Sequence, residues 1–225
     1  MTHHLVRLAA IVTCAAIWAS PALAFDAAHV EQLHATLQCP NCNLTDADLD
    51  GAELADVYLT YADLSGATLV GANLRDAYIR FAYLIQTDLT EANLDRAGLW
   101  DAVLTGVVLV RASLRGAALR GATLRDADLT EADLTGAFLT NANFRVATLT
   151  RANLTDADLT GAAFGGAILV DADLTDAILA NTGFQGADLT GANLSGTDLS
   201  SANLTDTIFC RTTMPDGSID ETGCP

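Results

Sequence analysis

The sequence has 225 residues and no lysine, and its 28 acidic residues outweigh 11 arginines to give a formal charge of −17 at pH 7. Direct binding to nucleic acid or to anionic lipid needs a basic surface, so this composition disfavours both. Hydrophobic residues make up 51% of the chain, and this content argues against disorder, because disordered chains are poor in apolar residues.

Residues 1–24 have the features of an export signal. The basic start MTHHLVR precedes the apolar run LAAIVTCAAIWA, and the small-residue motif ALA ends at Ala24. The run is short for a membrane span, so we expect cleavage after Ala24, with an uncleaved anchor as the alternative. No second apolar segment of spanning length follows. We therefore expect a periplasmic or secreted protein with no membrane span in the mature chain.

The next segment, residues 25–41, predicts a helical cap. In FDAAHVEQLHATLQ, residues 25–38, the apolar residues Val30, Leu33 and Leu37 recur at helical spacing, and Asp26 is a suitable N-cap. The cap ends in the sequence CPNC, residues 39–42.

A five-residue period dominates the rest of the chain. Every fifth residue from Leu44 to Phe209 is Leu, Ile or Phe, at 34 consecutive positions that include Leu124, Leu129, Leu134 and Leu139. The residue two places earlier is Ala in 27 of the 34 cases and otherwise Cys, Val or Thr. A helix repeats every 3.6 residues and a strand every 2, so neither fits. One large and one small apolar residue can both point inward if each pentapeptide forms one side of a coil.

The phenylalanines indicate how many sides the coil has. Phe144, Phe164 and Phe184 replace leucine at intervals of twenty, which is four pentapeptides. In a four-sided coil these side chains stack in one interior column, where bulky neighbours accommodate one another.

The A(D/N)LxX repeats of residues 42–211 resemble the pentapeptide-repeat family, as do the flanks, CPxC before the repeats and TTMPDGS after them. The resemblance implies an all-β fold, a right-handed quadrilateral parallel β-helix of about twenty residues per coil. Thirty-four repeats make about 8.5 coils and a rod roughly 41 Å long. We expect the helical cap at one end and residues 212–225, with a PDG turn, as a cap at the other.

The same architecture restricts the cysteine pairing. Cys42 and Cys210 lie about 8.4 coils apart, roughly 40 Å, whereas a disulfide requires Cα atoms within about 7 Å. We therefore expect Cys39 to pair with Cys42 and Cys210 with Cys224.

The CPNC motif leaves two alternatives to a structural disulfide. It resembles a redox motif, but it follows a helix instead of opening one. A zinc site formed by Cys39, Cys42 and His34 lacks an evident fourth ligand. His29 and His34 are not on one helix face, and no nucleophile–His–acid trio or phosphate-binding glycine loop is present. We expect no enzyme activity, metal or cofactor.

One outer face of the predicted rod carries most of its exposed aromatics. We call this surface face four. It is the side of the coil whose central residues are 59, 79, 99, 119 and 139 and continue at intervals of twenty to 199, together with the adjoining corner, which holds Tyr61 and Phe81. Six of the seven outward aromatics beyond Phe25 belong to it, and Tyr83 lies just round the corner. These aromatics have two alternative roles: they stack as ladders that stabilise neighbouring coils, or they form a binding face. The candidate binding residues are Tyr58, Tyr61, Tyr78, Arg80, Phe81, Trp100, Arg120 and Phe138.

The leading hypothesis is an exported, non-catalytic scaffold that uses face four to bind a protein, a glycan or a second copy of itself. The family resemblance supplies an alternative, an acidic DNA mimic that binds a type II topoisomerase such as gyrase. Two features disfavour it: the export signal, and residues 106–151, where six arginines against four acids interrupt the acidic surface.

Overall fold

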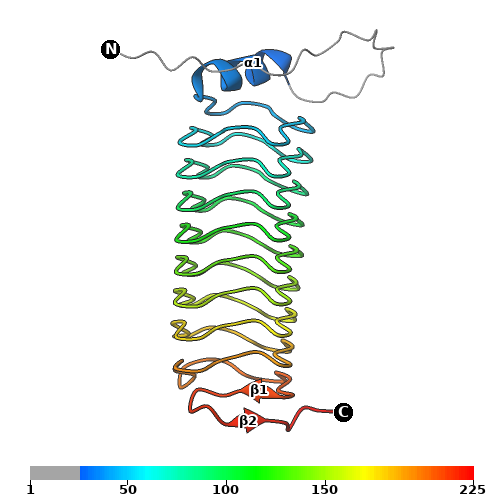
Figure 1. Ribbon diagram of the computed structural model, residues 1–225, viewed down its shortest axis with the longest axis vertical. Coiled ribbons are helices and arrows are strands. Elements are labelled where there is room, and N and C mark those ends of the chain that lie inside the picture. The colour runs from blue at the N-terminus through cyan, green and yellow to red at the C-terminus, as the bar shows by residue number, and fades with distance from the viewer. Residues whose placement is uncertain (1–25) are drawn as a thin grey trace.

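The computed structural model describes residues 26–225 and shows a stack of similar coils (Figure 1). The predicted signal peptide, residues 1–24, lies outside the described residues. Helix α1, Ala27–Thr36, covers one end, and strands β1, Thr212–Thr213, and β2, Ile219–Asp220, form the other. Within residues 26–225, no helix is both long enough and apolar enough to cross a membrane.

The predicted period of twenty is confirmed by the backbone pairing. Parallel bridges join residues twenty apart, from Gln38 with Tyr58 to Asn193 with Thr213. Tyr78 illustrates the pattern: its N–H donates to the Val57 carbonyl at 2.8 Å, and its carbonyl accepts from the Leu59 N–H at 2.8 Å. Each side of a coil is so short that it pairs through one bridging residue instead of a longer strand.

The inward assignment of the large and small apolar positions is also confirmed. Leu124, Leu129, Leu134 and Leu139 have no exposed surface. Phe144, Phe164 and Phe184 form one interior column, with ring centroids 4.7 Å and 5.3 Å apart.

Threonine at the small inward position has a role that the repeat pattern did not reveal. Thr87 and Thr182 are fully buried, and each hydroxyl donates to a carbonyl 23 residues earlier, of Leu64 at 2.8 Å and of Leu159 at 2.9 Å. The polar group therefore enters the core with its hydrogen bond satisfied, which removes most of the desolvation cost.

The corners of the coils depend on left-handed backbone. The Ala62 N–H donates to the Leu59 carbonyl at 3.0 Å to close a turn, and Tyr61, the third residue of that turn, has φ 61°. This geometry favours glycine or asparagine, yet the same position holds a β-branched residue at Val146, with φ 60°.

Replacing Val146 by asparagine should stabilise the rod by about 1 kcal/mol, because left-handed backbone is costly for a β-branched residue and tolerated by asparagine. Little packing is lost, since Val146 is 56% exposed. Thermal denaturation should show a higher midpoint. Val108→Asn is the matched control, because Val108 faces outward without a positive φ, and an equal gain there would contradict the explanation.

The aspartates and asparagines before the central leucines organise the backbone. Asp128 Oδ1 accepts hydrogen bonds from the Thr130 N–H at 3.0 Å and the Thr130 hydroxyl at 2.6 Å. Asn153 makes the same two contacts with Thr155. An amide and a carboxylate accept equally here, which explains why the repeat uses both.

Asp128→Ala should therefore cost about 1 kcal/mol, whereas Asp128→Asn should be close to neutral. Denaturant titration of the two variants measures the difference. Equal losses would mean that charge, and not the hydrogen bonds to Thr130, is what matters at this position.

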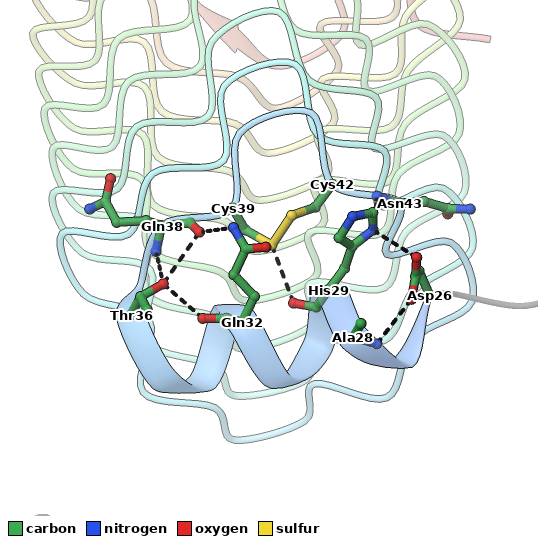
Figure 2. Close-up of a disulfide and its surroundings, with 9 residues drawn as sticks. All are labelled: Asp26, Ala28, His29, Gln32, Thr36, Gln38, Cys39, Cys42 and Asn43. Carbon is green, nitrogen blue, oxygen red and sulfur yellow. Dashed lines mark hydrogen bonds and ion pairs between the residues drawn. A yellow bond between two sulfur atoms is a disulfide. The ribbon is translucent and has the colours of Figure 1, made fainter.

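Helix α1 closes the first coil as predicted (Figure 2). Asp26 is its N-cap and accepts from the Ala28 N–H at 3.0 Å, and Leu33 is fully buried. Cys39 and Cys42 form a disulfide where the chain passes from α1 into the first coil. His29 Nδ1, on the helix, accepts a hydrogen bond from the Asn43 N–H at 3.1 Å.

The exit cap is a small hairpin. β1 and β2 pair antiparallel, with Thr212 opposite Asp220 and Thr213 opposite Ile219. β1 also continues the solenoid, because Thr213 bridges Asn193 of the preceding coil. A disulfide joins Cys210 to Cys224, and it ties the last residues back to the final coil. Both predicted pairs are therefore present, one in each cap.

Candidate binding face

Two vertical columns of side chains make up most of face four. The first holds the residues before the central positions, Tyr58, Tyr78, Gly98, Ala118 and Phe138, and we call it the ring column. The second holds the residues after them, Thr60, Arg80, Trp100, Arg120 and Thr140, and we call it the arginine column. Backbone bridges between residues twenty apart fix the ring column, and hydrogen bonds such as that from the Phe81 N–H to the Trp100 carbonyl, at 3.0 Å, hold the coils in the same alignment at the arginine column.

The ring column begins with a stacked pair. The Tyr58 and Tyr78 rings are 4.4 Å apart between centroids and 9° from parallel, and their exposed fractions are 42% and 44%. The neighbouring Tyr58 phenol raises the pKa of Tyr78 above its usual value, mainly because two phenolates so close together would repel each other. The pair presents stacked rings to solvent.

The arginine column contains cations without carboxylate partners. The Arg80 guanidinium lies 4.4 Å from the centroid of the Trp100 ring, which is a cation–π contact. No comparable contact joins Arg120 to Trp100 among the described residues. Within the same residues, Arg80 and Arg120 make no salt bridge, whereas Arg111 pairs with Glu91 at 2.7 Å.

The ring column is interrupted at two successive coils. Gly98 and Ala118 follow Tyr78, and the next ring belongs to Phe138, which is 56% exposed. One cavity of about 240 Å³ lies over Gly98, between Tyr78 and Trp100, and a second of about 380 Å³ lies over Ala118, between Trp100 and Phe138. At the coil spacing of about 4.8 Å, the gap has room for two further stacked rings.

A charged pair borders this gap on the other side. Arg96 Nε donates to Asp76 Oδ1 at 2.7 Å, and both residues line the cavity over Gly98. The Arg96 bond holds the pKa of Asp76 below its usual range and raises the pKa of Arg96. This pair was not predicted, although its signal, opposite charges twenty residues apart, is present in the sequence.

The candidate residues fall into three groups. Tyr58, Tyr78, Arg80 and Trp100 form one continuous patch. At the corner, Tyr61 and Phe81 stack with centroids 5.0 Å apart, and Arg80 lies 5.7 Å from the Phe81 ring. Arg120 and Phe138 line the second cavity, over Ala118.

The zinc alternative at CPNC is wrong, because the two sulfur atoms are bonded to each other. Cys39 and Cys42 are also 0% and 2% exposed, so the disulfide is not presented as an accessible redox centre. Within residues 26–225, no group of three His, Cys, Asp or Glu side chains is placed to hold a metal ion.

Comparisons with known proteins define the class. The family model described as "Pentapeptide repeats" matches in eight copies between residues 39 and 214. The chain therefore belongs to the pentapeptide-repeat family, and its solenoid is the right-handed quadrilateral β-helix of that family.

Three solved structures illustrate the range of relatives. HetL from Nostoc sp. strain PCC 7120, described as involved in heterocyst differentiation regulation, is 31% identical over 85% of this chain and 98% of its own, with a TM-score of 0.66. A protein of the Arabidopsis thaliana thylakoid lumen is also 31% identical, over 46% of this chain and 66% of its own, with a TM-score of 0.26. QnrB1, a plasmid-mediated fluoroquinolone resistance protein, is 21% identical over 80% and 85%, with a TM-score of 0.38. No curated protein matches this chain significantly.

Proposed function

We propose that this protein is an exported, non-catalytic scaffold whose recognition surface is face four. The observation that carries the proposal is the interrupted ring column: two cavities, of about 240 and 380 Å³, lie between exposed rings, beside two arginines without salt bridges. A ladder that served only to stabilise neighbouring coils would gain nothing from the gap at Gly98 and Ala118.

Protein is the partner class that this chemistry favours over glycan. Tyrosine, tryptophan and arginine are the residues enriched at the centres of protein interfaces. The arginine stacked on Trp100 also covers one face of the ring that a sugar would use. The exposed rings are amphipathic and are held in place by stacking, so binding costs them little conformational freedom.

The DNA-mimic alternative receives less support from the surface. A duplex mimic needs a continuous acidic rod, whereas residues 106–151 carry six arginines and four acids. Four of these six arginines pair with carboxylates, as Arg115 does with Asp133 at 2.8 Å, and Arg120 and Arg145 make no salt bridge among the described residues.

Site-specific photo-crosslinking in the organism that makes the protein tests the proposal. A photoreactive residue at position 118, on the floor of the gap, should give adducts. The matched control is position 108, which holds the same place in its pentapeptide but lies two pentapeptides away, on the opposite side of the rod. Equal adducts from both positions, or none from position 118, would contradict recognition through face four.

Cell fractionation with N-terminal sequencing tests the export. The expected mature protein begins at Phe25 and is found outside the cytoplasm. A cytoplasmic protein that retains Met1 would overturn this part of the proposal and would reopen the topoisomerase alternative.

A further inference from the structure

We infer that the partner of face four is a second copy of this chain, bound antiparallel about a two-fold axis that passes between the coils of Tyr78 and Gly98. This inference rests on the proposed role of face four as a recognition surface. It follows from how the residues of face four complement those of a second face four that is rotated by a two-fold axis, so that the direction of its rod is reversed.

The symmetry fixes which residues meet. A two-fold axis that lies in the interface and crosses the rods at right angles makes them antiparallel, and it sets each column of side chains against the same column of the other copy. With the axis between Tyr78 and Gly98, each residue faces the one equally far from the axis in the opposite direction. The coil of Tyr78 therefore meets the coil of Gly98, and the coil of Tyr58 meets that of Ala118.

The rings then fill the gap. Tyr78 lies opposite Gly98 of the second copy, and Tyr58 lies opposite its Ala118. The rings of the stacked pair are 4.4 Å apart between centroids. This distance is close to the coil spacing of about 4.8 Å that separates Gly98 from Ala118 in the gap. Each copy supplies two rings and receives two, so the tyrosines of both copies and Phe138 at either end form one continuous ladder.

The charges agree with the same register. Asp76 meets Arg96 of the second copy, so the two intrachain pairs become a quartet of alternating charge. In the arginine column Arg80 meets Trp100, and the guanidinium that already stacks on its own Trp100 gains an equivalent ring from the partner.

Neighbouring registers lack this agreement. With the axis moved one coil towards the N-terminus, Tyr58 would meet Tyr78 and Asp56 would meet Asp76, which sets ring against ring and acid against acid. With the axis moved one coil the other way, Tyr78 would meet Phe138, and Gly98 would meet Ala118 and leave the cavities empty. An axis through the coil of Tyr78 would set Asp76 against Asp76 of the second copy, and an axis through the coil of Gly98 would set Arg96 against Arg96 of the second copy. Like charges in contact disfavour the registers that set acid against acid or arginine against arginine, and the unfilled cavities disfavour the remaining one.

A charge-exchange experiment tests both the dimer and its register. Residues 25–225 should sediment as a dimer. In the Asp76→Arg variant each Arg96 faces an arginine of the other copy, and in the Arg96→Asp variant each Asp76 faces an aspartate, so each variant alone should weaken the dimer by at least about tenfold. An equimolar mixture of the two variants should restore dimerisation, as a heterodimer, because both contacts between position 76 of one copy and position 96 of the other again join opposite charges.

Two further variants separate this interface from others. Gly98→Gln places a side chain in the part of the gap that Tyr78 of the second copy would occupy, and it should weaken the dimer similarly. Glycine is not needed there for its backbone conformation, and a Cβ at this position would make an ordinary van der Waals contact with the Ala77 carbonyl oxygen, at 3.9 Å. Glu91→Arg breaks the pair with Arg111, an ion pair of the same type on another corner, and should leave the dimer unchanged.

The outcomes distinguish this inference from the proposed function. A monomeric wild-type protein, a dimer that survives both charge variants, or a mixture that stays monomeric would overturn the antiparallel dimer. The mass of the adduct from position 118 then decides the rest. An adduct of twice the chain mass indicates a second copy, whereas an adduct with a different protein preserves face four as a recognition surface with another partner.

Discussion

Leu134→Asp should interrupt the rod at its middle coils and cost more than about 4 kcal/mol, the largest effect that we expect from one substitution. Leu134 has no exposed surface, and its coil is bridged on both sides, by Asp133 with Ser113 and with Asn153. A carboxylate at position 134 would be buried among leucines without a counter-charge, and the leucine packing would be lost as well. Circular dichroism during heating should show the loss of the native transition.

Leu134→Met is the control, because it conserves volume and adds no charge, and it should cost less than about 1.5 kcal/mol. If the aspartate variant melted like the native protein, the inward orientation of the central position would be wrong. The interior column would then need another assignment.

Phe164→Ala should be the second largest effect, a loss of about 3–5 kcal/mol. Phe164 is fully buried and is the middle ring of its column, with Phe144 and Phe184 stacked on its two sides. Alanine would leave a cavity between two rings that the backbone bridges hold in place, so the site has little freedom to collapse. Denaturant titration followed by circular dichroism measures the loss.

Phe164→Leu restores the residue that the repeat uses elsewhere, and it should cost about 1.5 kcal/mol or less. An effect as large as that of alanine would show that the stacking of the rings, and not the volume they fill, determines stability in this column.

The sequence predicted the fold well because a single short rule repeats 34 times. Leucine and alanine at fixed spacing determine which residues point inward, and the three phenylalanines fix the coil at twenty residues. The helix over Ala27–Thr36 and its N-cap Asp26 were likewise predictable from local chemistry, and the disulfide pairs followed from the length of the rod.

The details of the binding face were less accessible. Exposed residues are not constrained by the repeat, so the pattern placed Tyr58, Tyr78 and Trp100 on one side without giving their contacts. Arg80 stacks on Trp100, whereas Arg120, one coil further along the same column, makes no such contact among the described residues, and the spacing alone does not distinguish the two. The gap at Gly98 and Ala118 was visible only as two small residues, and its meaning depends on the rings above and below it.

The bridges between residues twenty apart also restrict how such a chain can change in length. Loss or duplication of one full coil would leave every remaining side chain on its original face and only shorten or lengthen the rod. Loss of a single pentapeptide would preserve the buried leucines equally well, yet it would turn everything beyond it by one side of the coil. The ring column would then be split between two faces, so a deletion that hardly affects folding would abolish recognition.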